Sequence, residues 1–295
     1  MDLGRVHPVV SICLDVLCLI LAWLTVIVLN QSYVRPFQRG FFCDDESIRY
    51  PHRESTITHE LLYSLGVLAP VLSIIAGELY YVRYLNYRPQ SFMDNPYVAT
   101  LYRKLGAFLF GMGVSQSFTN VAKFACGRLR PHFFAVCRPN STLYNCSDGY
   151  IAKDVCMEDP IYVDESRKSF YSGHSSFAMY TMVFLVLYLE ARLTWRVVRT
   201  LRPLLQFMLL IAAVYVGLSR VSDYKHYWSD VLMGFLQGVA VAIFAVFAVS
   251  GLFDKSQVNE PEVNDVNDDG TYGAVQQRTM MRNSAQNAAA LSSGP

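Results

Sequence analysis

Residues Ser219 to Asp230 read Ser-Arg-Val-Ser-Asp-Tyr-Lys-His-Tyr-Trp-Ser-Asp and lie between two long apolar segments. His226 and Asp230 are four residues apart, so on a helix they would share one face. A carboxylate beside an imidazole fixes its tautomer and raises its basicity, which suits a nucleophile or a base. Arg220 adds a planar fork of donors that fits phosphate. The same residue types are also common in membrane-interface loops, so this segment alone leaves both interpretations open.

The apolar segments on either side belong to a larger pattern. The chain has 295 residues, of which 53% are hydrophobic and 17% are charged, and the charged share is low for a soluble domain. Several apolar runs approach the ~20 residues that span a bilayer as a helix. We therefore predict an all-α, polytopic membrane protein with one six-span domain over residues 1–253. The predicted spans are 9–29, 61–82, 105–124, 173–190, 204–219 and 231–253.

The charge distribution predicts the orientation of these spans. Residues 191–203 carry Arg192, Arg196, Arg199 and Arg202 without an acid, which places this loop in the cytoplasm. The loops 30–60, 125–171 and 220–228 are then outside. The four arginines of the first outer loop count against this orientation, although acids accompany them. The polar segment 254–295 is predicted to be a disordered cytoplasmic tail. The net charge of +1 and the lack of a basic stripe give no indication of nucleic-acid binding.

The predicted outer loops hold two kinds of modification candidates. Asn140 and Asn145 begin Asn-x-Ser/Thr triplets and are predicted glycosylation sites. An oxidising compartment would permit disulfides among the loop cysteines, but the sequence does not fix their pairing. These loop cysteines are Cys43, Cys126, Cys137, Cys146 and Cys156. Inside the first span, Asp15 is predicted to pair with a neighbouring helix or to reach the interface.

Two further polar clusters lie at span ends. The third span ends with Lys123, Arg128 and Arg130 within eight residues, which could be interface anchors or an anion site. The fourth opens with Ser172-Gly173-His174, which could be a helix cap or a phosphate cradle, because glycine allows close approach and a helix start offers free N–H groups. The predicted topology brings both clusters to the same membrane face as Arg220, His226 and Asp230. Two histidines and an acid could bind zinc, but the cations favour an anion such as phosphate.

Together the three clusters carry a family resemblance. Lys123-x6-Arg130-Pro131, Ser172-Gly173-His174 and Ser219-Arg220-x5-His226-x3-Asp230 resemble the three-part signature of the type 2 phosphatidic acid phosphatase superfamily. That group includes lipid phosphate phosphatases, bacterial acid phosphatases and vanadium haloperoxidases. The first loop, from Phe37 to Pro51, resembles the animal lipid phosphate phosphatases in particular. Tyr171 stands where the superfamily often has proline, as it does in those animal enzymes.

The resemblance implies a fold, a mechanism and residue roles. The fold is the helical bundle shared by these phosphatases and the vanadium haloperoxidases. His226 would be the nucleophile that forms a phosphohistidine, Asp230 would orient it, and His174 would protonate the leaving lipid oxygen. The residues that would hold the phosphate are Lys123, Arg130, Ser172, Gly173 and Arg220. No metal or other cofactor is expected. By sequence alone Asp223 is a rival to Asp230, and Arg128 is interpreted as a rim residue.

The predicted function is a lipid phosphate monoester phosphatase acting on phosphatidate, lysophosphatidate, sphingosine 1-phosphate or ceramide 1-phosphate. Its active site would be extracellular at the plasma membrane, or luminal in the endoplasmic reticulum or Golgi. A homo- or hetero-oligomer with related phosphatases remains open. One alternative is a catalytically silent lipid-binding or adhesion protein of the same fold. Another is a transporter or channel, and its only support is the set of polar residues in the third span. A haloperoxidase is disfavoured by the six membrane spans.

Overall fold

The computed structural model of the chain describes residues 8–31, 34–85, 87, 89, 91, 93–193 and 199–253. The predicted tail, 254–295, and Arg196 of the predicted cytoplasmic loop lie outside the described residues.

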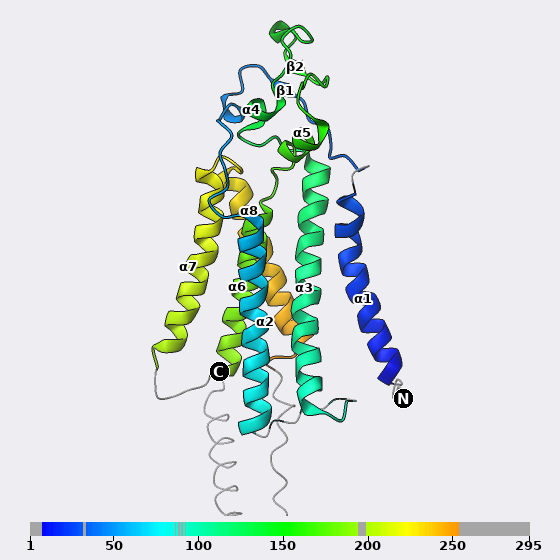
Figure 1. The fold of residues 1–295 in the computed structure, drawn as a ribbon, viewed down its shortest axis with the longest axis vertical. Helices are drawn as coiled ribbons and strands as arrows, with labels where there is room; N and C mark the ends of the chain where they lie inside the picture. Colours follow the sequence, from blue (N-terminus) through cyan, green and yellow to red (C-terminus); the bar gives the residue numbers. More distant parts are fainter. Residues whose placement is uncertain are drawn as a thin grey trace, which may run out of the picture. The chain divides into compact units, whose positions relative to one another are not determined.

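Within the described residues, six long helices run alongside one another, and each overlaps one of the predicted spans (Figure 1). They are α1 (Pro8–Leu29), α2 (His59–Tyr84), α3 (Pro96–Cys126), α6 (Gly173–Arg192), α7 (Leu201–Ser222) and α8 (Trp228–Phe244). The last continues as a π-helical segment, η3 (Ala245–Ser250).

The third helix begins earlier than the sequence predicts. Asn95 caps its N-terminus and Pro96 occupies its first turn, both of which are favourable there. Lys104, which we predicted to lie in a loop, is inside α3 and buried. Its Nζ donates to the carbonyl oxygen of Ser250, at 2.8 Å. The sequence predicted too late a start for α3 because Lys104 is charged. In the structure a hydrogen bond across the bundle satisfies this charge, so Lys104 can lie within the helix.

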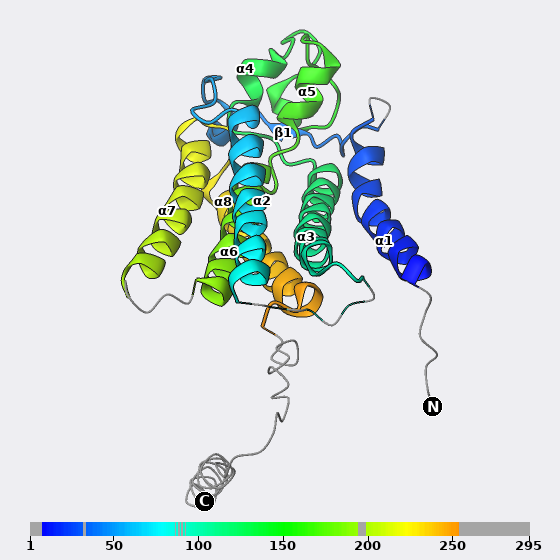
Figure 2. The ribbon, with the colours of Figure 1, turned by 60° about the horizontal axis from the view of Figure 1, so that its bottom comes forward.

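Four of the described helices are long and apolar enough to span a membrane, namely α1, α2, α7 and the segment Trp228–Ser250. The other two, α3 and α6, carry polar residues along faces that other helices cover. In particular, α6 packs against α2, α3, α7 and α8 (Figure 2). The membrane prediction is thus confirmed for several helices, while the count of six spans is not.

Close packing between α6 and α8 positions the residues at the starts of these two helices. A Cβ at Gly238 of α8 would lie 2.5 Å from the carbonyl oxygen of Ser176 in α6, and one at Gly234 would lie 2.8 Å from that of Ser172. Only glycine allows the two backbones to approach this closely. The first turns of α6 and α8 are therefore held against each other.

The loops beside the start of α6 form a folded cap, residues 34–58 and 127–172 (Figure 1). Its short elements are β1 (Phe41–Phe42), η1 (Glu46–Ile48), α4 (Phe133–Cys137), η2 (Cys146–Asp148), β2 (Tyr150–Ile151) and α5 (Pro160–Ser166). The two strands pair antiparallel, with Phe41 opposite Ile151. Around this pair, Ile48, Phe133 and Val155 form a small apolar core. The predicted loop 125–171 is thus largely folded.

Two disulfides tie the cap together, and the structure gives the pairing that the sequence left open. Cys43 bonds to Cys146 and Cys137 bonds to Cys156. Cys126 is a free thiol at the end of α3 and not a loop residue. The first bond joins the two cap segments, so it fixes the first loop to the second.

The junction between α3 and the cap depends on one glycine. Gly127 ends α3 in the left-handed conformation, with φ +54°, a common helix C-cap. Its missing Cβ would lie 2.0 Å from the carbonyl oxygen of Phe37, and the amide of Phe37 donates to the carbonyl of Phe124 at 2.9 Å. The first cap segment therefore packs directly on the end of α3.

At the opposite ends of the helices, a buried ion pair joins α2 to α6. The Glu78 carboxylate is fully buried and accepts from Nε and Nη2 of Arg192, at 2.8 and 3.2 Å, and from the Tyr188 hydroxyl at 3.1 Å. Arg192 was predicted as one of four loop arginines. In another interhelical contact, Asp15 of α1 accepts from the Tyr102 hydroxyl of α3 at 2.8 Å, so the predicted pairing of Asp15 with a neighbouring helix is confirmed.

Candidate active site

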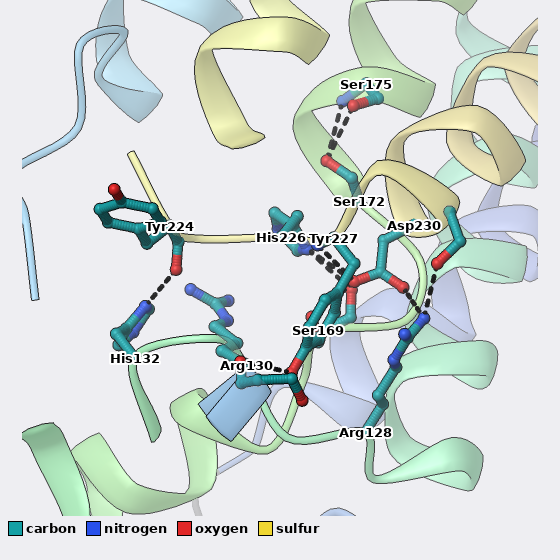
Figure 3. Close-up of polar contacts among 12 residues, drawn as sticks. Arg128, Arg130, His132, Ser169, Ser172, Ser175, Tyr224, His226, Tyr227 and Asp230 are labelled. Carbon is teal, nitrogen blue, oxygen red and sulfur yellow. Dashed lines mark hydrogen bonds and ion pairs between the residues drawn. The ribbon is translucent and has the colours of Figure 1, made fainter. Parts of the chain in front are cut away.

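The three predicted clusters meet where four helices end beside the cap. Lys123 lies in the last turn of α3, His174 in the first turn of α6, and Arg220 in the last turn of α7. His226 lies in the connection between α7 and α8, and Asp230 in the first turn of α8. Segments that are a hundred residues apart in sequence therefore supply one site, part of which Figure 3 shows.

His226 is held by the backbone of the segment before α6. Its Nδ1 lies 2.8 Å from the carbonyl oxygen of Ser169, a contact that requires the proton on Nδ1 and leaves the Nε2 lone pair available (Figure 3). Burial, only partly opposed by Asp230, lowers the pKa of His226. The ring is therefore neutral at pH 7, as a nucleophilic imidazole must be.

Asp230 is close to His226, but not for the predicted reason. His226 precedes α8, so the two residues do not share a helix face, and Nδ1 lies 3.7 Å from Oδ2 of Asp230. Instead, Oδ2 accepts from the Tyr227 amide at 3.2 Å and from the Ser169 hydroxyl at 2.6 Å. Asp230 is the third residue of α8 and the N3 member of a capping box, which fixes its carboxylate at the helix start.

Arg128 was interpreted as a rim residue, and the structure corrects this. Its Nη1 donates to Oδ1 of Asp230 at 2.6 Å and to the hydroxyl of Ser229 at 2.9 Å. Its guanidinium lies 4.2 Å from the centre of the Tyr227 ring (Figure 3). The Asp230 side chain is 0% exposed, so Arg128 neutralises a buried charge that would otherwise be costly.

The rival acid, Asp223, serves a different group. Its carboxylate accepts from the amide and the hydroxyl of Thr56, at 2.8 and 2.7 Å, and lies 3.7 Å from Nη1 of Arg220. Asp223 therefore joins the cap to α7 beside Arg220, and it is not a partner of His226.

The start of α6 combines a cap with a close approach. Ser172 is the N-cap, and its hydroxyl accepts from the amide and hydroxyl of Ser175, at 3.3 and 2.9 Å (Figure 3). A Cβ at Gly173 would lie 3.1 Å from Nζ of Lys123. Because glycine lacks this atom, the Lys123 ammonium group can lie against the N-terminus of α6. The ammonium charge and the positive end of the helix dipole are therefore close together.

His174 points into the same region. Its ring centre lies 4.4 Å from that of His59, the first residue of α2. Its Nε2 is buried and has no hydrogen-bond partner within the described residues. The same is true of Nε of Arg130 and Nε of Arg220. Buried polar atoms are normally paired, so these three donors indicate where a ligand would bind.

A cavity of about 560 Å³ opens beside these atoms. Its polar lining includes His52, His59, Arg130, His132, Glu158, Glu165, Arg220 and Lys225. A second cavity, of about 620 Å³, lies between α1 and α3 and has mostly apolar walls. The first cavity is lined by Arg130 and Arg220 of the predicted phosphate-binding set, whereas Lys123, His174 and His226 are not among its lining residues. It has the size of a ligand site and an excess of cations.

Several residues of the site carried no sequence signal. Glu165 accepts a hydrogen bond from Nη2 of Arg130 at 2.5 Å. His132 bonds through Nδ1 to the carbonyl oxygen of Tyr224 at 2.7 Å, and Ser169 holds both His226 and Asp230. These residues belong to the cap, and only its folding brings them to the helix ends. Ser169 lies only three residues before Ser172, and this closeness to the Ser-Gly-His cluster was the one indication that the sequence offered for its position at the site.

Comparison with known proteins agrees with this geometry. Residues 104–253 match the family described as the PAP2 superfamily. Phospholipid phosphatase 1 of Rattus norvegicus is 50% identical over 86% of this chain and 90% of its own. Phospholipid phosphatase 2 of Mus musculus is 51% identical over 85% of this chain and 90% of its own, and that of Homo sapiens is 51% identical over 83% and 84%. No solved structure matches the chain.

The matched region contains every one of the three motif clusters, and the relatives cover most of α1 to α8 besides. The chain therefore belongs to the PAP2 superfamily and is an enzyme of its lipid phosphate phosphatase group.

Proposed function

We propose that this enzyme hydrolyses lipid phosphate monoesters, among them phosphatidate, lysophosphatidate, sphingosine 1-phosphate and ceramide 1-phosphate, through a phosphohistidine and without a metal. One observation carries the proposal. The neutral imidazole of His226 lies close enough to His174, Lys123 and Arg130 for their charges to interact. Beside it, buried nitrogen atoms of Arg130, Arg220 and His174 have no partner within the described residues. A phosphate group supplies the acceptor oxygens that such donors require.

In the first step, Nε2 of His226 attacks phosphorus and the bond to the lipid oxygen breaks. His174 gives its proton to the leaving alkoxide. The positive charge that develops on the His226 ring is stabilised by the Ser169 carbonyl at Nδ1 and by the Asp230 carboxylate 3.7 Å away. In the second step, His174 takes a proton from water, the oxygen attacks phosphorus, and the N–P bond breaks to release phosphate and neutral His226.

The remaining groups neutralise the phosphate. Lys123, Arg130 and Arg220 supply the charge that a metal supplies in other phosphoryl-transfer enzymes. The N–H of Gly173 and the side chain of Ser172 lie at the start of α6, where the helix dipole favours an anion. A substrate with two negative charges also favours the protonated form of His174 that the first step needs.

We further propose that the domain over residues 1–253 crosses the membrane six times, with α3 and α6 shielded by the more apolar helices. The substrate phosphate would stay at headgroup level, and the site would face the outside or a lumen. Asn140 and Asn145 are in the cap and accept from Thr142 and Ser147 in the local turns of their triplets. Glycosylation of either residue, read as a mobility shift removed by an amidase and by Asn→Gln substitution, would support this orientation.

The central experiment measures phosphate release from phosphatidate in mixed micelles with excess EDTA. Wild type is expected to release phosphate, whereas His226→Ala is expected to be inactive and to form no acid-labile phosphoenzyme. Arg35→Met, an exposed cap residue outside the lining of the cavity, is the control and is expected to keep most activity. Loss of release on chelation would contradict the metal-independent mechanism. A folded wild type that releases no phosphate from any lipid would favour a silent lipid-binding role.

A further inference from the structure

Glu165 is an acid inside the cationic site. It lies in α5, and Oε1 accepts from Nη2 of Arg130 at 2.5 Å, while Oε2 is 3.6 Å from Nζ of Lys168. Its side chain is 52% exposed, and the space beside it is the cavity that Arg130 and Arg220 also line. The carboxylate is therefore placed where it can leave without crossing packed side chains.

The electrostatic surroundings keep this carboxylate charged. Packing of the cap around the half-exposed side chain removes part of its solvation and opposes ionisation, but the charges of Arg130, Lys123 and Lys168 outweigh this and lower the pKa of Glu165 to about 2. At neutral pH a full negative charge thus lies among the cations that we assign to phosphate. Two of these cations, Lys123 and Arg130, act on Glu165 and on His226 alike.

A carboxylate and a phosphate present the same kind of oxygen to a guanidinium group. Glu165 occupies only part of the available donors, because Nε of Arg130, Nε of Arg220 and Nε2 of His174 are still without partners within the described residues. A phosphate that used these donors would come close to Glu165, and two like charges in one pocket repel strongly.

We propose that Glu165 is an internal counter-ion that competes with phosphate for Arg130 and must release it when phosphate binds. The proposal rests on the proposed function for the identity of the ligand. Glu165 lowers the excess positive charge of the empty pocket, so singly charged anions gain less by entering, whereas a phosphate monoester dianion gains enough to displace it. Glu165 therefore sets specificity and does not take part in bond breaking.

The backbone allows this movement to be local. The amide of Arg130 donates to the carbonyl of Ser166 at 2.8 Å, next to Glu165 in the chain. Val163 anchors the same short helix in the apolar core of the cap. The backbone on both sides stays fixed, so rotation of the Glu165 side chain alone separates its carboxylate from Arg130.

The test compares Glu165→Gln, which removes the charge and keeps the shape, with Glu190→Gln. Glu190 is also a partly exposed glutamate paired with an arginine, Arg202 at 3.3 Å, but it does not line the cavity. Two readouts are used. The first is inhibition of lipid phosphate hydrolysis by inorganic phosphate and by orthovanadate. The second is the rise in unfolding temperature that each anion produces, which needs no turnover.

We expect Glu165→Gln to lower the inhibition constants for phosphate and vanadate about fivefold to tenfold, as the loss of one partly solvated like charge predicts. KM should fall with them, and the anion-induced rise in unfolding temperature should grow. Glu190→Gln should change each value less than twofold. Higher inhibition constants in Glu165→Gln would show that Glu165 positions Arg130 for phosphate, and unchanged constants would show no competition. Either result overturns the proposal.

The two proposals fail in different ways. If wild type hydrolyses no lipid phosphate, the proposed function fails, yet stabilisation by phosphate or vanadate still compares the two variants. If wild type is active and Glu165→Gln binds both anions no more tightly, the proposed function stands and only the role of Glu165 is wrong.

Discussion

Nη1 of Arg128 donates to Oδ1 of Asp230 at 2.6 Å, while the hydroxyl of Ser169 donates to Oδ2 at the same distance. Both oxygens of the buried Asp230 carboxylate therefore accept hydrogen bonds from side chains of the cap. This leaves Asp230 able to act on His226 only through its charge, at 3.7 Å. The cap therefore controls the electrostatics of the imidazole as well as its position.

Arg128→Met should reduce activity without weakening substrate binding. Removing the guanidinium leaves the buried Asp230 carboxylate with less compensation, so that the capping box and the adjacent His226 shift. We expect kcat to fall about tenfold to hundredfold, with KM changed little. Losses of this size follow when a residue that holds a metal-bound histidine in place is removed, and Arg128 has a comparable supporting role here. The measurement is steady-state hydrolysis in micelles. Arg35→Met, which breaks an exposed pair with Asp164 at 3.8 Å, is the control, and an equal loss in both variants would contradict the assignment.

Arg192→Met should destabilise the helix bundle far from the site. The Glu78 carboxylate would remain buried without its counter-charge, a change that costs about 3 to 5 kcal/mol for buried pairs. The unfolding temperature in detergent should fall accordingly. Arg202→Met, which breaks an exposed pair with Glu190 at 3.3 Å, should change it little. Recovery in Glu78→Leu/Arg192→Met would attribute the loss to the unpaired charge, and no recovery would argue against it.

His132 should make the protein less stable in acid. Burial, with the charges of Arg130 and Lys225 and nearby His52, lowers the pKa of His132 to about 3. The unfolded chain, with a pKa of about 6.5, binds the proton first, so stability is complete above that value and declines as pH falls below it. At pH 5 this histidine alone should cost about 2 kcal/mol.

The measurement for this pH effect is the unfolding temperature of wild type and His132→Gln between pH 7.5 and 5. His132→Gln is expected to start lower, because the bond to the Tyr224 carbonyl changes, but to lose less on acidification. A parallel decline in both proteins would assign the acid sensitivity elsewhere, with buried His226 as the first alternative, since its pKa is lowered as well.

The two disulfides should contribute unequally. Cys43 and Cys146 are 103 residues apart, whereas Cys137 and Cys156 are 19 apart. In the chain-entropy view the longer loop gives more stabilisation, about 5 against about 3 kcal/mol. Paired Cys→Ser variants, compared by unfolding temperature, test the order. Peptide mapping without reduction should recover both links and a free thiol at Cys126, and any link that includes Cys126 would contradict the pairing.

Sequence patterns predicted the positions of the long helices well, because apolar length is a property of each segment alone. Residues 173–190 and 204–219 agree with α6 and α7 to within three residues at every end. The start of α3 was missed, since Lys104 is satisfied by Ser250 across the bundle. Hydropathy also could not show that α6 is the central helix, because its polar residues look the same whether water or other helices cover them.

The sequence by itself determined the family signature, the helical class and the identity of the groups at the site, because these depend on residue type and spacing along one segment. The tertiary structure alone decided which acid serves His226, which cysteines pair, and that Arg128, Ser169 and Glu165 of the cap complete the site. These choices depend on distances between segments far apart in the chain. Such distances follow from how the whole chain packs, and no local pattern encodes them.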